Sequence, residues 1–236
     1  MKKLLIAGAL CAMIMFPSAA QEASARKGAP AKANWFVSAG FGGQVYFGDH
    51  DSQAEFGKRI SPALDIAVGK WFTPSIGVRL MYSGLSFKGA TQNWDIATNP
   101  GNGIHSTGEK LPGEKSGYNY RLEYSKFNEF SLSAEVMFNL NNAFAGYREN
   151  RVWGCCPYVG VGYARVTDEP VANGYLIRGG LLNSFRVGKA WSVNLDLRAG
   201  YLNDEFDGEV GGRSGEGFAS ATIGVTYNFK PRGWNR

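Results

Sequence analysis

One short stretch carries several groups that catalysis uses. Gly48-Asp-His-Asp-Ser52 places a histidine beside two carboxylates and a hydroxyl. A working triad is recognised by its geometry in space, and direct neighbours in a chain rarely form one. Asp, Gly and Ser are also ordinary turn-forming residues. The other histidine, His105, also has no nucleophile positioned beside it. We therefore expect no enzyme and no catalytic residue.

Two adjacent cysteines, Cys155 and Cys156, could form a metal site or a disulfide bridge. No histidine is spaced nearby to complete a zinc site, so we expect no metal. Successive side chains of a strand point to opposite faces, which favours two buried thiols over a strained vicinal disulfide. The glycine pairs Gly160-Val-Gly162 and Gly40-Phe-Gly-Gly43 do not complete G-x-G-x-x-G and do not precede a helix, so no cofactor is expected.

The elements that would position these groups are strands. The stretch 219–229, ASATIGVTYNF, alternates apolar residues with small or polar ones, which gives a strand one apolar face and one polar face. The same alternation recurs in eight segments: 34–47, 60–72, 76–88, 127–140, 153–165, 175–185, 191–203 and 217–229. Several are longer than the ~5–6 residues usual in soluble sheets, and long enough for a tilted strand that crosses a bilayer.

The N-terminus indicates export. A basic start, an apolar stretch and the small residues Ser18-Ala-Ala20 are typical of a secretory signal peptide at 1–20. We expect a periplasmic segment at 21–33, a barrel at 34–229 and a tail at 230–236. No apolar run of 18 residues follows the signal peptide, so the chain can cross an inner membrane without stopping there.

The polar faces of the strands separate a transmembrane barrel from a soluble β-sandwich. They carry many of the chain's 32 glycines, for example Gly69, Gly160 and Gly200. Glycine weakens a solvent-facing strand, whereas a narrow eight-stranded barrel needs small residues among the large ones inside it. The sequence therefore predicts an all-β, eight-stranded, antiparallel, up-and-down transmembrane barrel with its apolar face toward lipid.

Connections and aromatic residues support this prediction. Short connections at 73–75 and 187–190 alternate with longer polar ones, of which 89–126 is the longest, and transmembrane barrels have this asymmetry. The 141–151 connection is longer than the pattern predicts. Aromatics should form belts at both headgroup regions. We expect one belt at Trp35, Phe72, Phe138, Phe185, Trp191, Tyr227 and Phe229, and another at Tyr46, Phe47, Tyr82, Phe87, Phe127, Tyr163, Tyr175 and Tyr201.

The eight segments, the signal peptide and the last strand, Phe218 to Phe229, resemble the small outer-membrane barrels of the OmpA transmembrane-domain type. The resemblance implies insertion by the barrel-assembly machinery, with Tyr227 and Phe229 as the assembly signal, although seven residues follow Phe229. Longer members of that family carry a peptidoglycan-binding domain, which we do not expect in this chain. The resemblance also implies a Gram-negative outer membrane with both termini in the periplasm.

The alternation places seven charged residues inside the barrel: Asp65, Arg79, Glu129, Glu135, Arg178, Asp196 and Arg198. Isolated charges in a narrow lumen are costly, so we expect them to pair and close the lumen. The same residues could instead line a charged constriction, which would make the protein a narrow porin-like channel for small solutes or ions.

The formal charge of +5 is uneven, with Arg148, Arg151, Arg186 and Lys189 on the predicted periplasmic side. No clustered basic face with a nucleic-acid-binding fold is evident, which excludes nucleic acid as a partner. We expect contact with outer-membrane lipids and lipopolysaccharide. The function predicted is structural and interactive, with outer loops displayed to an unknown ligand. The channel is the alternative, and a lipid-modifying barrel enzyme is the third.

Overall fold

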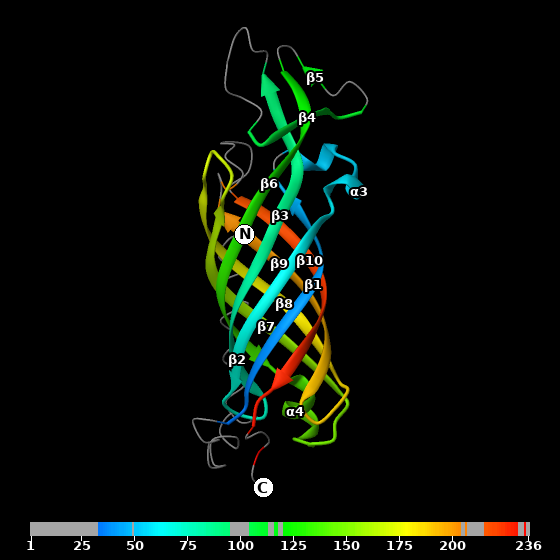
Figure 1. Ribbon diagram of the computed structural model, residues 1–236, viewed down its shortest axis with the longest axis vertical. Coiled ribbons are helices and arrows are strands. Elements are labelled where there is room, and N and C mark those ends of the chain that lie inside the picture. The colour runs from blue at the N-terminus through cyan, green and yellow to red at the C-terminus, as the bar shows by residue number, and fades with distance from the viewer. Residues whose placement is uncertain are drawn as a thin grey trace.

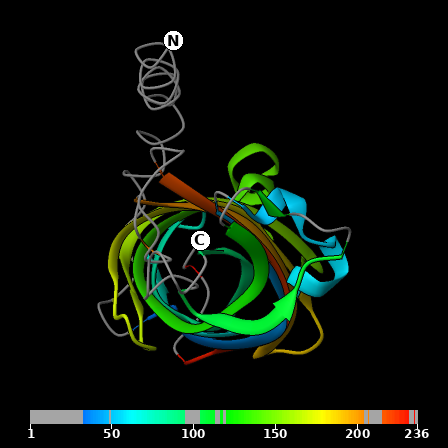
Figure 2. The same ribbon diagram turned by 90° about the horizontal axis from the view of Figure 1, so that it is seen from above.

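The computed structural model describes residues 33–48, 50–94, 104–112, 116–117, 120–203, 206, 215–230 and 234. Eight long antiparallel strands close into a ring, seen from the side in Figure 1 and down the axis in Figure 2. The expected signal peptide at 1–20, nearly all of 21–33 and part of the 230–236 tail lie outside the described residues. The predicted fold class is confirmed.

The strands of the ring match the eight alternating segments to within a few residues, except where two of them are longer. They are β1 (Trp35–Phe47), β2 (Ser61–Trp71), β3 (Ile76–Trp94), β6 (Tyr120–Phe138), β7 (Trp153–Val166), β8 (Asn173–Arg186), β9 (Trp191–Asn203) and β10 (Gly215–Asn228). Each pairs with its neighbours in the chain, β1 pairs with β10, and β3 pairs with β6. Because the sheet closes on itself, these strands leave no open edge along the ring.

The outer surface of the ring is apolar. Valine, isoleucine, leucine and phenylalanine side chains that soluble proteins bury are exposed here; Val161 is 63% exposed and Ile223 is 66% exposed. They alternate along each strand with buried residues that point inward, as the burial pattern of β9 and β10 shows. A continuous apolar band around a closed ring is the surface that a β-barrel presents to hydrocarbon chains.

The two ends of the barrel differ. We call one the short-turn end: it holds the connections at 72–75 and 187–190, the helix α4 (Leu140–Ala145), and residues 33 and 229. The opposite, long-loop end holds η1 (Asp51–Gln53), α3 (Phe56–Arg59), β4 (Ser106–Lys110) and β5 (Ser116–Gly117), as Figure 1 shows at the top. The described residues contain no helix long and apolar enough to cross a membrane.

The prediction of one long loop at 89–126 is wrong in part. β3 and β6 continue past the ring as a paired ribbon, in register as far as Trp94 and Tyr120, and β4 and β5 pair with β6 along it. This ribbon has its own small apolar cluster, formed by Ala54, Ala90, Leu111, Leu122 and Tyr124. These strands lack the alternation of the ring strands, because consecutive residues such as Leu122, Glu123 and Tyr124 are all buried.

The long 141–151 connection contains helix α4. The side chain of Asn139 caps this helix by accepting a hydrogen bond from the Asn142 N–H at 2.9 Å. Asn142 in turn donates its side-chain N–H to the carbonyl oxygen of Pro74 at 2.7 Å. The extra length therefore builds a capped helix that is fixed to the neighbouring short turn.

The interior is packed at both ends by apolar clusters. At the long-loop end the cluster includes Tyr46, Phe87, Phe127, Phe206 and Phe218. Phe87, for example, stacks on Tyr46 with ring centroids 4.8 Å apart. The prediction that Tyr46, Phe87 and Phe127 belong to a lipid-facing belt is thus wrong, since strand parity points all three inward, where they are at most 2% exposed.

At the short-turn end the interior cluster consists of Phe36, Met137, Cys156, Tyr158 and Leu182, with Trp71 packed against it. Glycines on neighbouring strands make room for these rings, as the sequence predicted in general terms. A Cβ atom on Gly69 would lie 2.3 Å from the Phe36 ring, and one on Gly180 would lie 2.5 Å from the Tyr158 hydroxyl. Small residues are therefore needed wherever a large ring crosses the narrow lumen.

Candidate functional site

Between the two apolar clusters lies a layer of charged side chains. All seven residues expected inside the barrel are buried, and they come from five strands of the ring: Asp65 on β2, Arg79 on β3, Glu129 and Glu135 on β6, Arg178 on β8, and Asp196 and Arg198 on β9. Six of them form one continuous set of ion pairs, with three guanidinium groups and three carboxylates. We call these six residues the ion-pair layer.

Glu135 is the shared acceptor on one side of this layer. Its two carboxylate oxygens accept hydrogen bonds from Arg79 Nε at 2.5 Å and from Arg178 Nε at 2.7 Å. Arg79 also donates from Nη2 to Asp196 at 2.9 Å. The last bond joins β3 to β9, so it crosses the lumen rather than linking neighbouring strands.

Arg198 organises the other side of the layer. Its Nη1 donates to Asp65 Oδ1 at 2.9 Å, and its Nη2 donates to the second oxygen of the same carboxylate, which makes a two-pronged pair. Asp196 lies 3.6 Å from Arg198 Nη2 and so connects the two halves. β2 and β9 are separated by β1 and β10, so this pair also spans the lumen.

Hydroxyl groups supply further hydrogen bonds to the layer, although the buried Nε of Arg198 has no partner among the described residues. Ser83 and Ser133 accept from the two Nη atoms of Arg178. Tyr158 donates to Asp196 Oδ1 at 2.6 Å, and Thr222 donates to Asp65 at 2.7 Å. Low dielectric surroundings make an unpaired charge costly, and these contacts keep the charges compensated.

Glu129 lies apart from the six. It is buried toward the long-loop end of the layer and accepts a hydrogen bond from Gln44 Nε2 at 3.1 Å. Gln44 also donates to the backbone oxygen of Ser86 at 3.0 Å, which ties β1 to β3 across β2. The sequence placed Glu129 on the inner face. Strand alternation could not show that its hydrogen-bond partner is Gln44 and not one of the arginines.

The GDHDS stretch has a structural role at the long-loop end. The Asp51 carboxylate accepts hydrogen bonds from the Gly48 N–H at 2.7 Å and from the Ala90 N–H at 2.6 Å, so it fixes the loop to β3. His50 is half-buried beside it, and Asp49 lies outside the described residues. Ser52 is exposed. Among the described residues, no cluster of three metal-binding side chains is present.

The adjacent cysteines are free thiols in this structure. Cys156 points inward and is buried in the cluster at the short-turn end, whereas Cys155 is half-buried on the other face. The expectation that both are buried is therefore wrong for Cys155. Its backbone N–H donates to Asn141 Oδ1 of α4 at 2.6 Å.

The aromatic residues expected to form a belt at the short-turn end lie on the outside of the ring. Trp35, Phe72 and Trp191 are about half exposed, and Phe138 is partly buried. Tyr227 bridges Trp191 and Phe229, with ring centroids 4.8 Å and 5.1 Å away. The expected assembly-signal residues thus lie in the same aromatic row as this belt.

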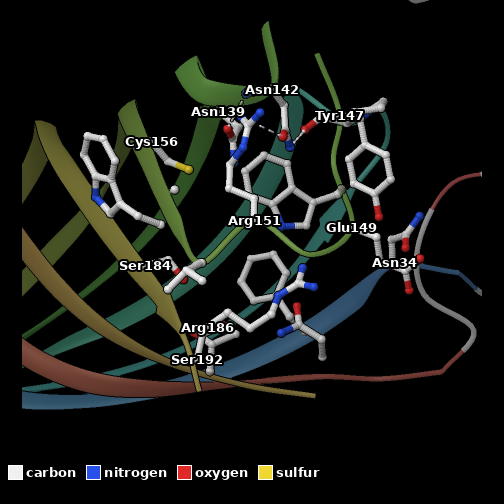
Figure 3. A pocket seen from close by; sticks show the side chains of 18 of the residues that line it. Asn34, Asn139, Asn142, Tyr147, Glu149, Arg151, Cys156, Ser184, Arg186 and Ser192 are labelled. Atoms are coloured by element: carbon white, nitrogen blue, oxygen red, sulfur yellow. Dashed lines mark hydrogen bonds between the residues drawn. The ribbon is translucent and has the colours of Figure 1, made fainter. Parts of the chain in front are cut away.

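The sequence did not predict a cavity at the mouth of the short-turn end (Figure 3). It has a volume of about 190 Å³ and lies between α4, the segment 147–154 and the ends of β8 and β9. Its rim carries Arg148, Arg151, Arg186 and Lys189, and Phe36, Trp71, Met137 and Leu182 line its inner part. The basic residues were visible in the sequence, but only the packing of α4 gathers them around one space.

Sequence comparison finds two similar outer-membrane proteins, while no family model matches the chain. The chain is 25% identical over 250 residues to Outer membrane protein 40 of Porphyromonas gingivalis, covering 98% of this chain and 58% of that protein. It is 24% identical over 181 residues to Outer membrane protein 41 of the same organism, covering 73% of this chain and 39% of that protein. The chain therefore spans little more than half the length of the first of these relatives.

Comparison with solved structures finds other small barrels at low sequence identity. The N-terminal barrel domain of Pseudomonas aeruginosa OprF is 12% identical and covers 86% of this chain and 100% of that one, with a TM-score of 0.45. Neisserial surface protein A is 11% identical and covers 83% and 97%, with a TM-score of 0.46. The outer membrane protein OprG of Pseudomonas aeruginosa is 12% identical and covers 84% and 97%, also with a TM-score of 0.46.

Proposed function

We propose that this integral outer-membrane β-barrel protein of a Gram-negative envelope has a structural and interaction role, with a lumen closed by its own side chains. In this proposal the short-turn end and both chain termini face the periplasm, and the long-loop end faces outward. The long-loop end then displays the ribbon of β3, β4, β5 and β6 to a partner outside the cell.

The ion-pair layer is the observation that carries the proposal. Arg79, Glu135 and Arg178 are at most 2% exposed. The Arg79–Asp196 and Arg198–Asp65 pairs join strands that are not neighbours and so reach across the lumen. An eight-stranded barrel is just wide enough to be filled by side chains. Apolar clusters on both sides of the layer add to the barrier, because an ion that leaves water there would lose its hydration without compensation.

The ribbon at the long-loop end supports the interaction part of the proposal. Its small apolar cluster and the two hydrogen bonds of Asp51 hold β3 and the loop before α3 together. Lys58 of α3 also pairs with Glu109 of β4 at 2.6 Å. A surface ordered in this way loses less conformational entropy when it binds a partner than a disordered loop would.

A non-catalytic role fits the same end of the molecule. Asp51, one of the two acidic residues beside His50, accepts hydrogen bonds from two backbone N–H groups and so fixes the loop to β3. We further propose that the aromatic row containing Trp191 and Tyr227 sits at lipid headgroups, where lipids and lipopolysaccharide contact the barrel. Tyr227 and Phe229 are the proposed assembly signal for the barrel-assembly machinery.

Planar-bilayer recording tests the closed lumen. The purified, refolded chain should show no steady single-channel current, while a known open porin reconstituted in the same way supplies the positive control. A stable, large conductance would refute the closed lumen and favour a narrow channel. Folding is checked on the same sample by the shift in gel migration on boiling that a folded barrel shows.

The orientation needs a separate test. In a Cys155→Ser, Cys156→Ser background, Gly57→Cys places a thiol at the long-loop end, and Gly188→Cys places one at the short-turn end. Neither position has an atom within 4 Å of a new Cβ. A membrane-impermeant maleimide applied to intact cells should label the first thiol and spare the second. The reverse pattern would overturn the proposed orientation.

A further inference from the structure

The cavity at the short-turn mouth has features of a binding site that the closed lumen does not need. It opens to solvent and is bordered by segments far apart in the chain, including Asn34, the α4–β7 connection and the ends of β8 and β9 (Figure 3). Its volume of about 190 Å³ is comparable to that of an apolar cavity able to hold one benzene-sized ring. The space therefore suits one small organic molecule rather than a folded partner.

The rim of this cavity is positively charged. Among the described residues that line it, four are basic and one, Glu149, is acidic. Within the described part of the chain, none of the four basic residues has a carboxylate within ion-pair distance. The four positive charges outnumber the one negative charge of Glu149, so the rim has a net positive potential that attracts an anion.

Arg151 is held in place by uncharged groups. Its guanidinium donates to the carbonyl oxygens of Gly146 at 2.9 Å and Ala145 at 3.4 Å, and to Asn142 Oδ1 at 3.4 Å. These acceptors orient the guanidinium without neutralising it. Arg186 enters the same space from the end of β8, as Figure 3 shows, so two guanidinium groups approach it from different elements.

The inner part of the cavity is apolar. Phe36, Met137 and Leu182 are buried side chains of the cluster at the short-turn end, and Trp71 packs against them. One buried polar atom also lines the space: Asn194 is 6% exposed, and its side-chain oxygen has no hydrogen-bond partner among the described residues. A hydroxyl or N–H group on a bound molecule would satisfy that oxygen.

We propose that this cavity binds a small organic anion whose carboxylate or phosphate group lies between Arg151 and Arg186 and whose ring or short alkyl part packs against Phe36 and Leu182. Guanidinium groups suit this role because they donate parallel hydrogen bonds to carboxylate and phosphate oxygens. The apolar part supplies the remaining affinity by leaving water. The charged rim and the apolar interior together select for a molecule that has both features.

Phenyl phosphate is the probe that carries both features, while inorganic phosphate and phenol each carry one. The full-length chain in detergent micelles is titrated with each compound, by calorimetry and by tryptophan fluorescence, since Trp71, Trp153 and Trp234 line the cavity. Phenyl phosphate should bind saturably and about tenfold or more tightly than either fragment, because each half of the site contributes.

Three variants test the assignment of the residues. Arg151→Gln and Arg186→Gln should each weaken phenyl phosphate binding about tenfold, the effect of losing one charge-assisted contact. Arg165→Gln removes an exposed arginine at the far end of the barrel and serves as the matched control, with no change expected. Ser184→Phe fills the cavity without altering its charge, so it should abolish phenyl phosphate binding and leave any phosphate binding intact.

Several results would overturn the proposal. The first is the absence of saturable phenyl phosphate binding to protein whose folding is confirmed by heat-modifiable migration. The second is equal affinity for inorganic phosphate and phenyl phosphate, which would mean simple attraction of ions to a basic surface. The third is unchanged binding in both arginine variants. None of these results bears on the conductance test, so the two proposals stand or fall separately.

Discussion

Neutralising Glu135 tests the ion-pair layer most directly, because this carboxylate pairs with two arginines. Glu135→Gln keeps the size and shape of the side chain but removes the charge shared by Arg79 and Arg178. Arg79 keeps Asp196 as a partner at 2.9 Å. Among the described residues Arg178 has no other carboxylate within ion-pair distance, so its guanidinium is left buried with only hydroxyl acceptors.

The magnitude follows from burial. Removing one partner of a buried ion pair typically destabilises a protein by about 3–5 kcal/mol, because the remaining charge stays desolvated without compensation. The amide oxygen of the glutamine still accepts one hydrogen bond, and Arg79 keeps its second carboxylate. We therefore expect the free energy of unfolding to fall by about 3 kcal/mol, at the low end of that range.

Urea unfolding in lipid vesicles measures this change, followed by tryptophan fluorescence and by gel migration without boiling. Glu109→Gln is the matched control, since it removes the same charge from the Lys58–Glu109 pair, whose side chains are 46% and 59% exposed. Exposed pairs contribute little because water screens them, so this control should lose much less stability than Glu135→Gln.

The comparison of the two variants can refute the reasoning. If Glu135→Gln loses no more stability than Glu109→Gln, the layer is hydrated or its charges are not held in these pairs. The proposed closure of the lumen would then lose its physical basis. An unchanged slope of the unfolding free energy against urea concentration is needed for the comparison, because the slope reports the surface exposed on unfolding.

Three further predictions concern other parts of the molecule. Gly200→Ala places a Cβ 2.2 Å from the aromatic ring opposite it, so urea unfolding should show a loss of about 1–3 kcal/mol, whereas Gly188→Ala, with nothing within 4 Å, should change stability little. Burial lowers the pKa of His105 below its ordinary 6.5. The contribution of His105 to the free energy of unfolding is therefore complete above pH 6.5 and is lost as the pH falls through the folded-state pKa. An NMR titration in micelles that found a His105 pKa of 6.5 or higher would contradict this prediction. Asp51→Ala removes the acceptor of two backbone N–H groups and should speed hydrogen exchange at the long-loop end, while Ser52→Ala, an exposed neighbour, should leave the rate unchanged.

The strands and their faces could be predicted because alternation is a local property. A residue's parity along its strand decides whether it points to lipid or to the lumen, whichever strands lie beside it. That is why the placement of Arg79 and Asp196 inside, and of Ile223 outside, needed no tertiary information. The same parity places Phe127 inside, and the prediction of a lipid-facing belt there failed because it weighed position along the strand and ignored the face.

The ribbon and helix α4 were missed for a different reason. The alternation signal depends on one face being buried and the other exposed. It disappears in the outer parts of β3 and β6, where consecutive residues such as Leu122, Glu123 and Tyr124 are all buried. The capping asparagine, Asn139, was a readable signal for a helix start, but a six-residue helix gives too short a pattern for its periodicity to be recognised.

By itself, the sequence determined that the chain forms eight strands, each with one face toward the lumen and one toward lipid. It also determined that charged side chains must meet inside a narrow ring. Only the tertiary structure decided which charges meet. Arg198 and Asp65 lie 133 residues apart and on strands that are not neighbours, and closure of the ring brings them together. The same holds for the basic cavity, whose arginines come from a loop and a strand end. The face to which a side chain points is fixed by its position along its own strand. Which side chains pair across the lumen depends on the stagger and tilt of all eight strands together.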